Sequence, residues 1–179
     1  LSLAFSPDGT LLVAGAADGR VRAFDVPRER RIGRSFRPGP SKTDVVADSI
    51  NAVAVSPDGR VVAAATEVGD IHQWDPAGKY LAKLAPSGPA AAIQAIMYAR
   101  APAGGEPVLF SGGDSNVVEE WAGAKALRLG EGRGDVHTLA VSDKIVISGG
   151  EDNTIRFWAR DARVQLRAMT GFGEEVLSL

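Results

Sequence analysis

Short apolar runs separated by turn signals fill most of the chain, and the clearest example runs from Ser148 to Ala159. This segment reads Ser-Gly-Gly-Glu-Asp-Asn-Thr-Ile-Arg-Phe-Trp-Ala, and two apolar runs, 144–148 and 154–158, flank a turn at 151–153. Asp and Asn tolerate the left-handed backbone that a tight turn needs, whereas Thr, Ile, Phe and Trp favour extended backbone. The pattern predicts a β-hairpin.

The same phrase occurs in three further copies. The four copies end on an aromatic residue, at Phe24, Trp74, Trp121 and Trp158. A second phrase precedes each copy: residues 3–9 and 53–59 both contain Ser-Pro-Asp-Gly, and weaker versions stand at 96–99 and 139–142. Self-similarity at a period of about 40 to 50 residues indicates a propeller or a solenoid array.

These phrases resemble those of the WD-repeat β-propeller family. The matching pieces are the Ser-Pro-Asp-Gly turns, the phrase Ser-Gly-x-x-Asp-x-x-Ile-Arg-x-Trp, and the endings Phe24-Asp25 and Trp74-Asp75. The resemblance covers nearly all of the 179 residues. It implies an all-β propeller in which each unit is a blade of four antiparallel strands, ordered from inner to outer strand along the chain.

We expect one domain with four such units, at residues 1–49, 50–92, 93–135 and 136–179. Residues 37–49 are expected to form a long loop, and residues 101–107 an expanded first turn, because both are rich in Pro or Gly. One extra residue before Trp121 predicts a β-bulge in the third unit.

The two ends of the sequence repeat each other. Leu1-Ser-Leu3 matches Leu177-Ser-Leu179, so four periods are cut within an innermost strand. An open row of four blades exposes two apolar faces, and closed propellers have roughly 4 to 8 blades. Either four blades close, or a second copy or further sequence completes the ring. We expect part of a seven- or eight-bladed ring, and no closed monomer from residues 1–179 alone. The lack of an initiator Met favours a fragment or a processed product.

Composition narrows the function only slightly. The net charge of −2 gives no bulk electrostatic argument for nucleic acid or membrane binding. No apolar run approaches the roughly 18 residues of a membrane span. The chain has no cysteine, which favours an intracellular and hence cytoplasmic location.

Several residues invite a functional reading but are expected to be structural. The aromatic residues Phe24, Trp74, Trp121 and Trp158 should pack blades together rather than stack on a ligand. Three turn carboxylates should form turns: Asp18, Asp114 and Asp152. In the family this Asp bonds a His in the loop before the inner strand. The corresponding loop positions here hold no His, so the network is absent or rewired; they are Val46, Pro89, Gly132 and Phe172.

Candidate catalytic and metal-binding groups are few. His72 and Arg156 are expected at outward-facing strand positions, and His137 near the start of an inner strand, packed, solvated or lining the channel. Two isolated histidines without cysteine do not make a zinc site. The segment 130–134 resembles a phosphate loop only superficially, because no helix pattern follows it. The arginines of 28–37 suit a solvated outer strand better than an anion site. With no nucleophile set, we expect no enzyme activity, metal or cofactor.

The resemblance implies binding of proteins or peptides at the propeller rims. The face made by the loops before the inner strands and by the turns between second and third strands is mostly acidic, so a basic peptide is the expected partner. The tentative rim residues are Asp48, Glu67, Arg133, Glu151, Glu174 and Glu175. Two other functions stay open: the regulatory or sensor propeller of a longer multidomain protein, and an enzyme with an active site in the channel.

Overall fold

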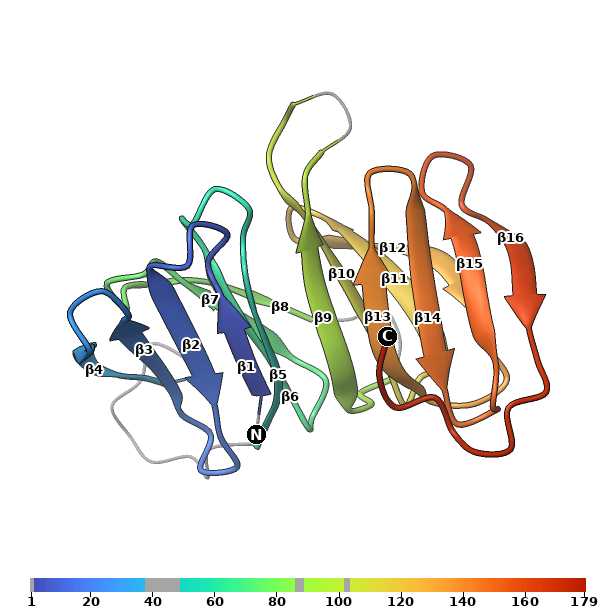
Figure 1. The fold of residues 1–179 in the computed structure, drawn as a ribbon, viewed down its shortest axis with the longest axis horizontal. Coiled ribbons are helices and arrows are strands. Elements are labelled where there is room, and N and C mark those ends of the chain that lie inside the picture. Colours follow the sequence, from blue (N-terminus) through green and yellow to red (C-terminus); the bar gives the residue numbers. More distant parts are fainter. Residues whose placement is uncertain (1, 38–48, 86–88, 102–103) are drawn as a thin grey trace.

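The computed structural model describes residues 2–37, 49–85, 89–101 and 104–179, and all regular structure within them is β-strand (Figure 1). The first sheet contains β1 (Ser2–Phe5), β2 (Leu11–Gly15), β3 (Val21–Asp25) and β4 (Arg30–Phe36). The second contains β5 (Ile50–Val55), β6 (Val62–Thr66), β7 (Ile71–Trp74) and β8 (Tyr80–Leu84). The third contains β9 (Ile93–Ala99), β10 (Val108–Gly113), β11 (Val117–Ala122) and β12 (Lys125–Glu131). The fourth contains β13 (Val136–Val141), β14 (Ile145–Gly150), β15 (Ile155–Ala159) and β16 (Val164–Met169).

Each sheet follows chain order, and every pairing is antiparallel. The prediction of four four-stranded blades is confirmed. The innermost strands β1, β5, β9 and β13 lie next to one another in that order, so the sheets form a row with the first and fourth at opposite ends (Figure 1).

The apolar core is divided into three layers, one between each pair of neighbouring sheets. Alternation along each strand supplies these layers, since successive side chains point to opposite faces. Thus Val13 and Trp74 meet between the first and second sheets, and Trp121 packs between the second and third. Phe110 and Trp158 belong to the layer between the third and fourth sheets.

The hairpin turns have the backbone that their residues predict. The third turn residue is left-handed in every sheet, with φ of 67° at Gly19, 92° at Gly69, 62° at Asn116 and 54° at Asn153. Glycine and asparagine accept this conformation at low cost. The turn predicted from residues 151–153 is therefore confirmed.

Glycines at the ends of second strands leave room for the next inner strand. A Cβ at Gly112 would lie 2.6 Å from Cγ1 of Val136, and a Cβ at Gly15 would overlap Ile50. Gly149 faces Val176 in the same way. These small residues therefore let each sheet approach its neighbour closely.

The β-bulge expected before Trp121 lies elsewhere. β10 and β11 pair without a break from Leu109–Trp121 to Ser111–Glu119, and the register shift falls between β11 and β12. The sequence spacing from Ser111 to Trp121 equals that from Ser148 to Trp158. Each tryptophan bonds its serine across the equivalent hairpin of its own sheet, so the third unit has no extra residue between them. Asp114 therefore corresponds to Glu151, one residue before the turn position of Asp152.

The outward orientation expected of His72 and Arg156 is wrong. Both stand two residues before a buried tryptophan and therefore share its face of the strand. His72 is buried against Trp74 and Tyr80, and the Arg156 side chain is only 13% exposed. The polar residue type suggested exposure, but the strand period places these side chains between sheets.

Candidate functional site

One carboxylate stands at the same turn position in three successive sheets. We call Glu67, Asp114 and Glu151 the acidic arc. Their backbone N–H groups donate to the carbonyls of Ser49, Ala92 and Asp135, which directly precede the inner strands. This shared bond holds the second-to-third-strand turn against the start of the inner strand. The three residues share one position of the repeat, so each lies at the same place in its sheet. All three carboxylates are exposed.

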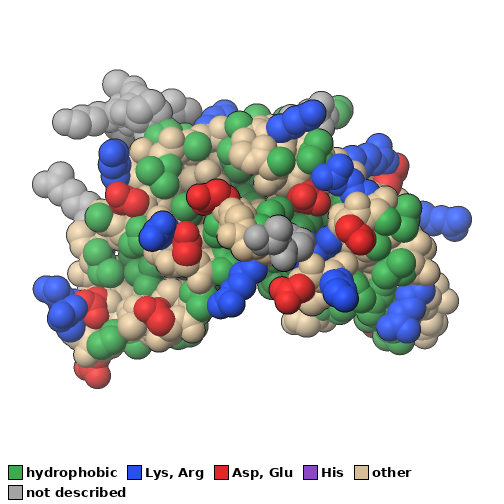
Figure 2. Space-filling view, turned by 90° about the horizontal axis from the view of Figure 1, so that it is seen from above, with side chains coloured by type: hydrophobic (Ala, Val, Ile, Leu, Met, Phe, Trp, Pro, Cys, Tyr) green, Lys and Arg blue, Asp and Glu red, His purple; other side chains and the backbone are tan. Residues whose placement is uncertain are grey.

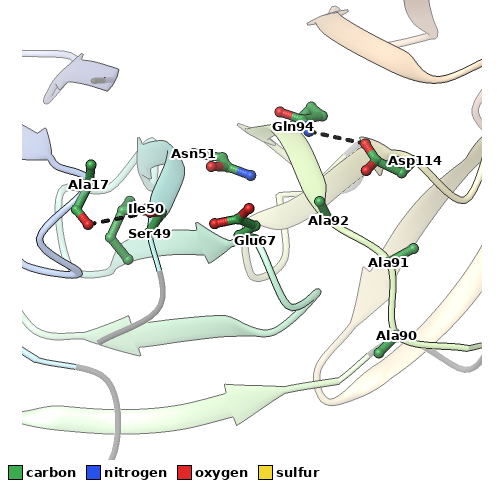
Figure 3. A pocket seen from close by; sticks show the side chains of 10 residues that line it. All are labelled: Ala17, Ser49, Ile50, Asn51, Glu67, Ala90, Ala91, Ala92, Gln94 and Asp114. Carbon is green, nitrogen blue, oxygen red and sulfur yellow. Dashed lines mark hydrogen bonds between the residues drawn. The ribbon is translucent and has the colours of Figure 1, made fainter. Parts of the chain in front are cut away.

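A cleft of about 860 Å³ lies beside two members of the acidic arc (Figure 3). Asn51 and Glu67 point into it from the second sheet, while Gln94 and Asp114 border it from the third. The Gln94 amide donates to Asp114 Oδ1 at 3.0 Å, which orients that carboxylate. The cleft thus combines two carboxylates with two side-chain amides, groups that accept hydrogen bonds from an ammonium or a guanidinium.

Further along the arc, Asp135 joins Glu151 and Glu175. The backbone N–H of Asp135 donates to Glu151 Oε2 at 3.4 Å. Partial burial, and next the charges of Asp114 and Glu151, raise the pKa of Asp135 above its ordinary value. Burial is the first cause of this shift, and repulsion from the neighbouring carboxylates adds to it. A cation would relieve that repulsion.

His137 stands at the inner edge of this group. Its Nε2 lies 3.3 Å from Glu175 Oε2, a contact that becomes an ion pair only when the imidazole is protonated. His137 and Gln94 occupy the same position near the start of their inner strands and line the surface formed by those strands. His137 thus lies on the surface that the inner strands form, and the lining of a channel by this residue stays a prediction.

The turn carboxylates Asp18 and Asp152 have a different role. Asp152 accepts hydrogen bonds from Arg156 at 2.6 and 3.0 Å, and Asp18 pairs with Arg22 at 2.5 Å. The backbone N–H of Arg133, in the loop before β13, also donates to Asp152 at 3.2 Å. A main-chain donor one residue after Gly132, the position where the family resemblance implies a histidine, thus bonds Asp152, and the network is rewired at this turn.

Three of the four third-strand aromatic residues pack between sheets. Trp74, Trp121 and Trp158 are buried, whereas Phe24 of the first sheet is partly exposed. The indole N–H of Trp121 donates to Ser111 Oγ and that of Trp158 to Ser148 Oγ, each at 2.9 Å. These contacts are those of packing residues, not of a stacking platform for ligands.

The structure brings together only part of the expected rim set. Glu67, Glu151 and Glu175 lie along one rim, Arg133 contacts Asp152 through its backbone, and Glu174 is exposed beside Glu175. Asp48 lies outside the described residues. Sequence reasoning missed Asn51, Gln94, Asp114 and Asp135 as rim residues. Asn51, Gln94 and His137 stand at the same position of their repeats, and this shared position could have identified Asn51 and Gln94 as rim residues.

The opposite face has a different character. Figure 2 looks onto the end of the molecule where the inner strands finish, and acidic and basic side chains alternate there among apolar ones. Asp8 and Asp58 on this side accept hydrogen bonds from Ser6 and Ser56 of their own turns. Their hydrogen bonds shape the Ser-Pro-Asp-Gly turns.

Two further kinds of site can be assessed among the described residues: metal-binding clusters and membrane-spanning helices. Among residues 2–37, 49–85, 89–101 and 104–179, no group of three or more His, Asp or Glu is placed to hold a metal ion. In the same ranges, no helix is both long and apolar enough to span a membrane.

Comparison with known families gives one result. The family model described as WD domain, G-beta repeat, matches residues 1–25 and residues 128–159. No curated protein in the comparison matches the chain. The two matched segments contain β1–β3 and β13–β15, the inner strand and hairpin of the first and fourth sheets.

Proposed function

WD repeats in the first and fourth units place the chain in the WD-repeat family, and from this premise we propose that it is a non-catalytic protein-interaction module. WD repeats generally mediate contacts between proteins. We propose further that the acidic arc and its cleft bind a segment of a partner protein that carries Lys or Arg.

The repetition of carboxylates along one rim is the observation that supports this partner class. Glu67, Asp114 and Glu151 occur once in each of the second, third and fourth sheets, so their spacing follows the sheet spacing, and Asp135 and Glu175 extend the group. An extended basic peptide could meet successive carboxylates, while Asn51 and Gln94 accept hydrogen bonds in the cleft. Electrostatic complementarity of this kind steers association and discriminates between partners.

An enzyme with an active site in the channel is the weaker alternative. On the described surface of the inner strands, His137 Nε2 lies beside Glu175 but makes no hydrogen bond, so no described hydroxyl is hydrogen-bonded to this nitrogen. A regulatory propeller of a longer protein is compatible with the interaction role, because regulation would use the same rim. The cytoplasmic location expected from the cysteine-free sequence stays a prediction.

Peptide binding tests the proposal. Fluorescein-labelled peptides of equal length, one Lys/Arg-rich and one with these residues replaced by Gln, are titrated with the protein at low and high salt. We expect the basic peptide to bind more tightly and to lose affinity with salt, since exposed charges are screened. Glu67→Gln and Asp114→Asn should each weaken binding about two- to fivefold, corresponding to roughly 0.5–1 kcal/mol.

Asp161→Asn is the matched control, because Asp161 is an exposed carboxylate in the turn between β15 and β16, away from the acidic arc. It should leave the affinity unchanged. Equal affinity for the two peptides, or equal losses in all three variants, would contradict the rim assignment.

A further inference from the structure

Glu119 is a buried carboxylate at a strand position that holds arginine in two other sheets. The register of β10 and β11 places it where the register of β14 and β15 places Arg156. The same position holds Arg22 in the first sheet and His72 in the second. Glu119 is 9% exposed. The third sheet therefore turns a negative charge towards a place that receives a guanidinium or an imidazole in the other sheets.

The acidic partner of this arginine is replaced as well. In the fourth sheet the Arg156 guanidinium donates to both carboxylate oxygens of Asp152, at 2.6 and 3.0 Å. Asp152 stands four residues before Arg156, and the residue four before Glu119 is Ser115. The third sheet thus has a carboxylate and a hydroxyl at the two positions that hold a guanidinium and a carboxylate in the fourth. A guanidinium from outside the chain would restore the same kind of ion pair, with its two sides exchanged.

A cavity of about 330 Å³ borders Glu119, between the third sheet and the loop before β9. Polar and apolar side chains share its lining, which includes Ser115, Glu119, Pro89, Ala91, Ile93 and Val117. The volume is at the small end of ligand sites, which span roughly 300–1,000 Å³. It therefore fits one extended side chain better than a folded element. The apolar walls would cover the methylene groups of a lysine or an arginine, while Glu119 meets the charged end.

The loop before β9 forms one wall of this cavity and is held from both sides. A Cβ at Gly69 of the second sheet would lie 2.5 Å from the carbonyl oxygen of Ala91, so the loop packs directly on that turn. On the other side, the backbone N–H of Asp114 donates to the carbonyl of Ala92 at 3.0 Å. The wall is therefore formed before a ligand arrives, which lowers the entropic cost of binding.

The same loop separates the cavity from the cleft beside the acidic arc. Ala91 lines both spaces. Asp114, which borders the cleft in Figure 3, is followed directly in the chain by Ser115 of the cavity. Because consecutive Cα atoms are only about 3.8 Å apart, a segment bound along the arc would have the cavity within reach of one long side chain.

We propose that this cavity, which we call the Glu119 pocket, binds the guanidinium of one arginine of a partner protein. The inference rests on the proposed function, because that arginine belongs to the basic segment bound along the acidic arc. A carboxylate offers about four acceptor sites through its two oxygens, so a guanidinium can bind beside other contacts of Glu119. Arginine is favoured over lysine, since its planar and weakly hydrated guanidinium forms two parallel bonds with a carboxylate.

The charges around the Glu119 pocket favour a cation over an anion. Arg128 also lines the cavity and faces Glu119 across β11 and β12. Its side chain is 57% exposed, and its guanidinium is paired with Glu131. Together these three side chains carry two negative charges and one positive charge. An anionic ligand would therefore meet a net negative charge, whereas a guanidinium would balance it.

Methyl NMR spectra of the protein with labelled isoleucine and valine test the pocket directly. Titration with N-acetylarginine amide should shift the methyl signals of Ile93 and Val117, and N-acetyllysine amide should shift them less at equal concentration. Glu119→Gln should abolish these shifts. Glu120→Gln is the matched control, because Glu120 lies on the opposite face of β11, 3.7 Å from Arg163. Shifts that are absent in the wild type, or unchanged in Glu119→Gln, would overturn the pocket.

A double variant removes the site by a change that the repeat already contains. Ser115→Asp combined with Glu119→Arg copies the pair of Asp152 and Arg156 into the third sheet. The protein's own guanidinium should then occupy this place, so the arginine amide should no longer shift the Ile93 and Val117 signals. Circular dichroism checks that the strands are kept. Shifts that persist in a folded double variant would contradict the assignment.

Peptides separate this inference from the proposed function. The wild type should bind an arginine-only peptide about tenfold more tightly than a lysine-only peptide of equal length and charge. Glu119→Gln should bind the two equally, whereas Glu67→Gln should weaken both alike. Binding of both peptides without a preference for arginine would overturn the Glu119 pocket and leave the proposed function standing. Loss of all basic-peptide binding, with the methyl shifts kept, would overturn the proposed function alone.

Discussion

The indole N–H of Trp158 donates to the hydroxyl of Ser148 across one hairpin, at 2.9 Å. Both residues are buried, and the ring belongs to the apolar layer between the third and fourth sheets. Trp121 and Ser111 repeat the arrangement one sheet earlier. In the first unit, Phe24 and Ala14 stand at the positions of Trp158 and Ser148, so neither partner of this hydrogen bond is present there.

Trp158→Ala should lower the free energy of unfolding by about 3–5 kcal/mol, because a large cavity remains. Ser148→Ala should cost about 1–3 kcal/mol, since the indole N–H loses its buried acceptor. The double variant Ser148→Ala/Trp158→Phe, which reproduces the first unit, should cost less than the sum of its single changes. Urea melts of the wild type, Ser148→Ala, Trp158→Phe and the double variant give this cycle. Strict additivity of the losses in unfolding free energy would contradict a direct bond.

Gly130→Ala should destabilise the protein by about 1–3 kcal/mol, because overpacking displaces a buried ring. A methyl group at Gly130 would overlap the six-membered ring of Trp158. Gly173→Ala is the control, as no atom lies within 4 Å of a Cβ there. Thermal melts give the melting temperatures of both variants. Equal melting temperatures would show that the third and fourth sheets separate more easily than their packing implies.

Arg156→Ala should cost about 1–2 kcal/mol, more than an exposed strand arginine, because its side chain binds Asp152 between two sheets. Arg31→Ala, at an exposed position of β4, should change stability by less than about 0.5 kcal/mol. Denaturant midpoints compare the two directly. Equal midpoints would mean that the Asp152 pair contributes nothing.

Asp152→Asn should reduce stability at neutral pH but not in acid. Burial alone would raise the pKa of Asp152, but hydrogen bonds and the charge of Arg156 outweigh it and lower the pKa. The folded state therefore holds the proton less tightly than the unfolded state. This stabilisation is present above the ordinary Asp pKa and is lost as pH falls through the lowered value. The melting temperatures of the wild type and of Asp152→Asn should therefore converge as the pH falls from the ordinary Asp pKa through the lowered pKa of Asp152.

Asp135→Asn should have the opposite effect. Its raised pKa, caused by partial burial and then by Asp114 and Glu151, means that the folded state binds the proton more tightly. The carboxylate therefore destabilises the fold above the raised pKa, and this penalty disappears as pH falls below the ordinary value. We expect a gain below about 1 kcal/mol at pH 7, since the group is near the surface. A loss of stability at pH 7 would show that the negative charge is favourable there.

The sequence by itself determined the sheets. Alternating apolar residues define the strands, and Gly or Asn at turn positions ends them, because strand period and left-handed turns are local properties. The repeat of Phe24, Trp74, Trp121 and Trp158 fixed the number of units. The acidic character of the rim was also readable, through Glu67, Glu151 and Glu175.

Only the tertiary structure decided what covers each face of a strand. His72 and Arg156 look like surface residues in sequence, yet they share the buried face of Trp74 and Trp158. The grouping of Asp135 with Asp114 required the loops of two sheets to meet. The exposure of Leu3 and Met169 likewise depends on which neighbouring sheet is present, because a strand pattern specifies an apolar face but not the surface that covers it.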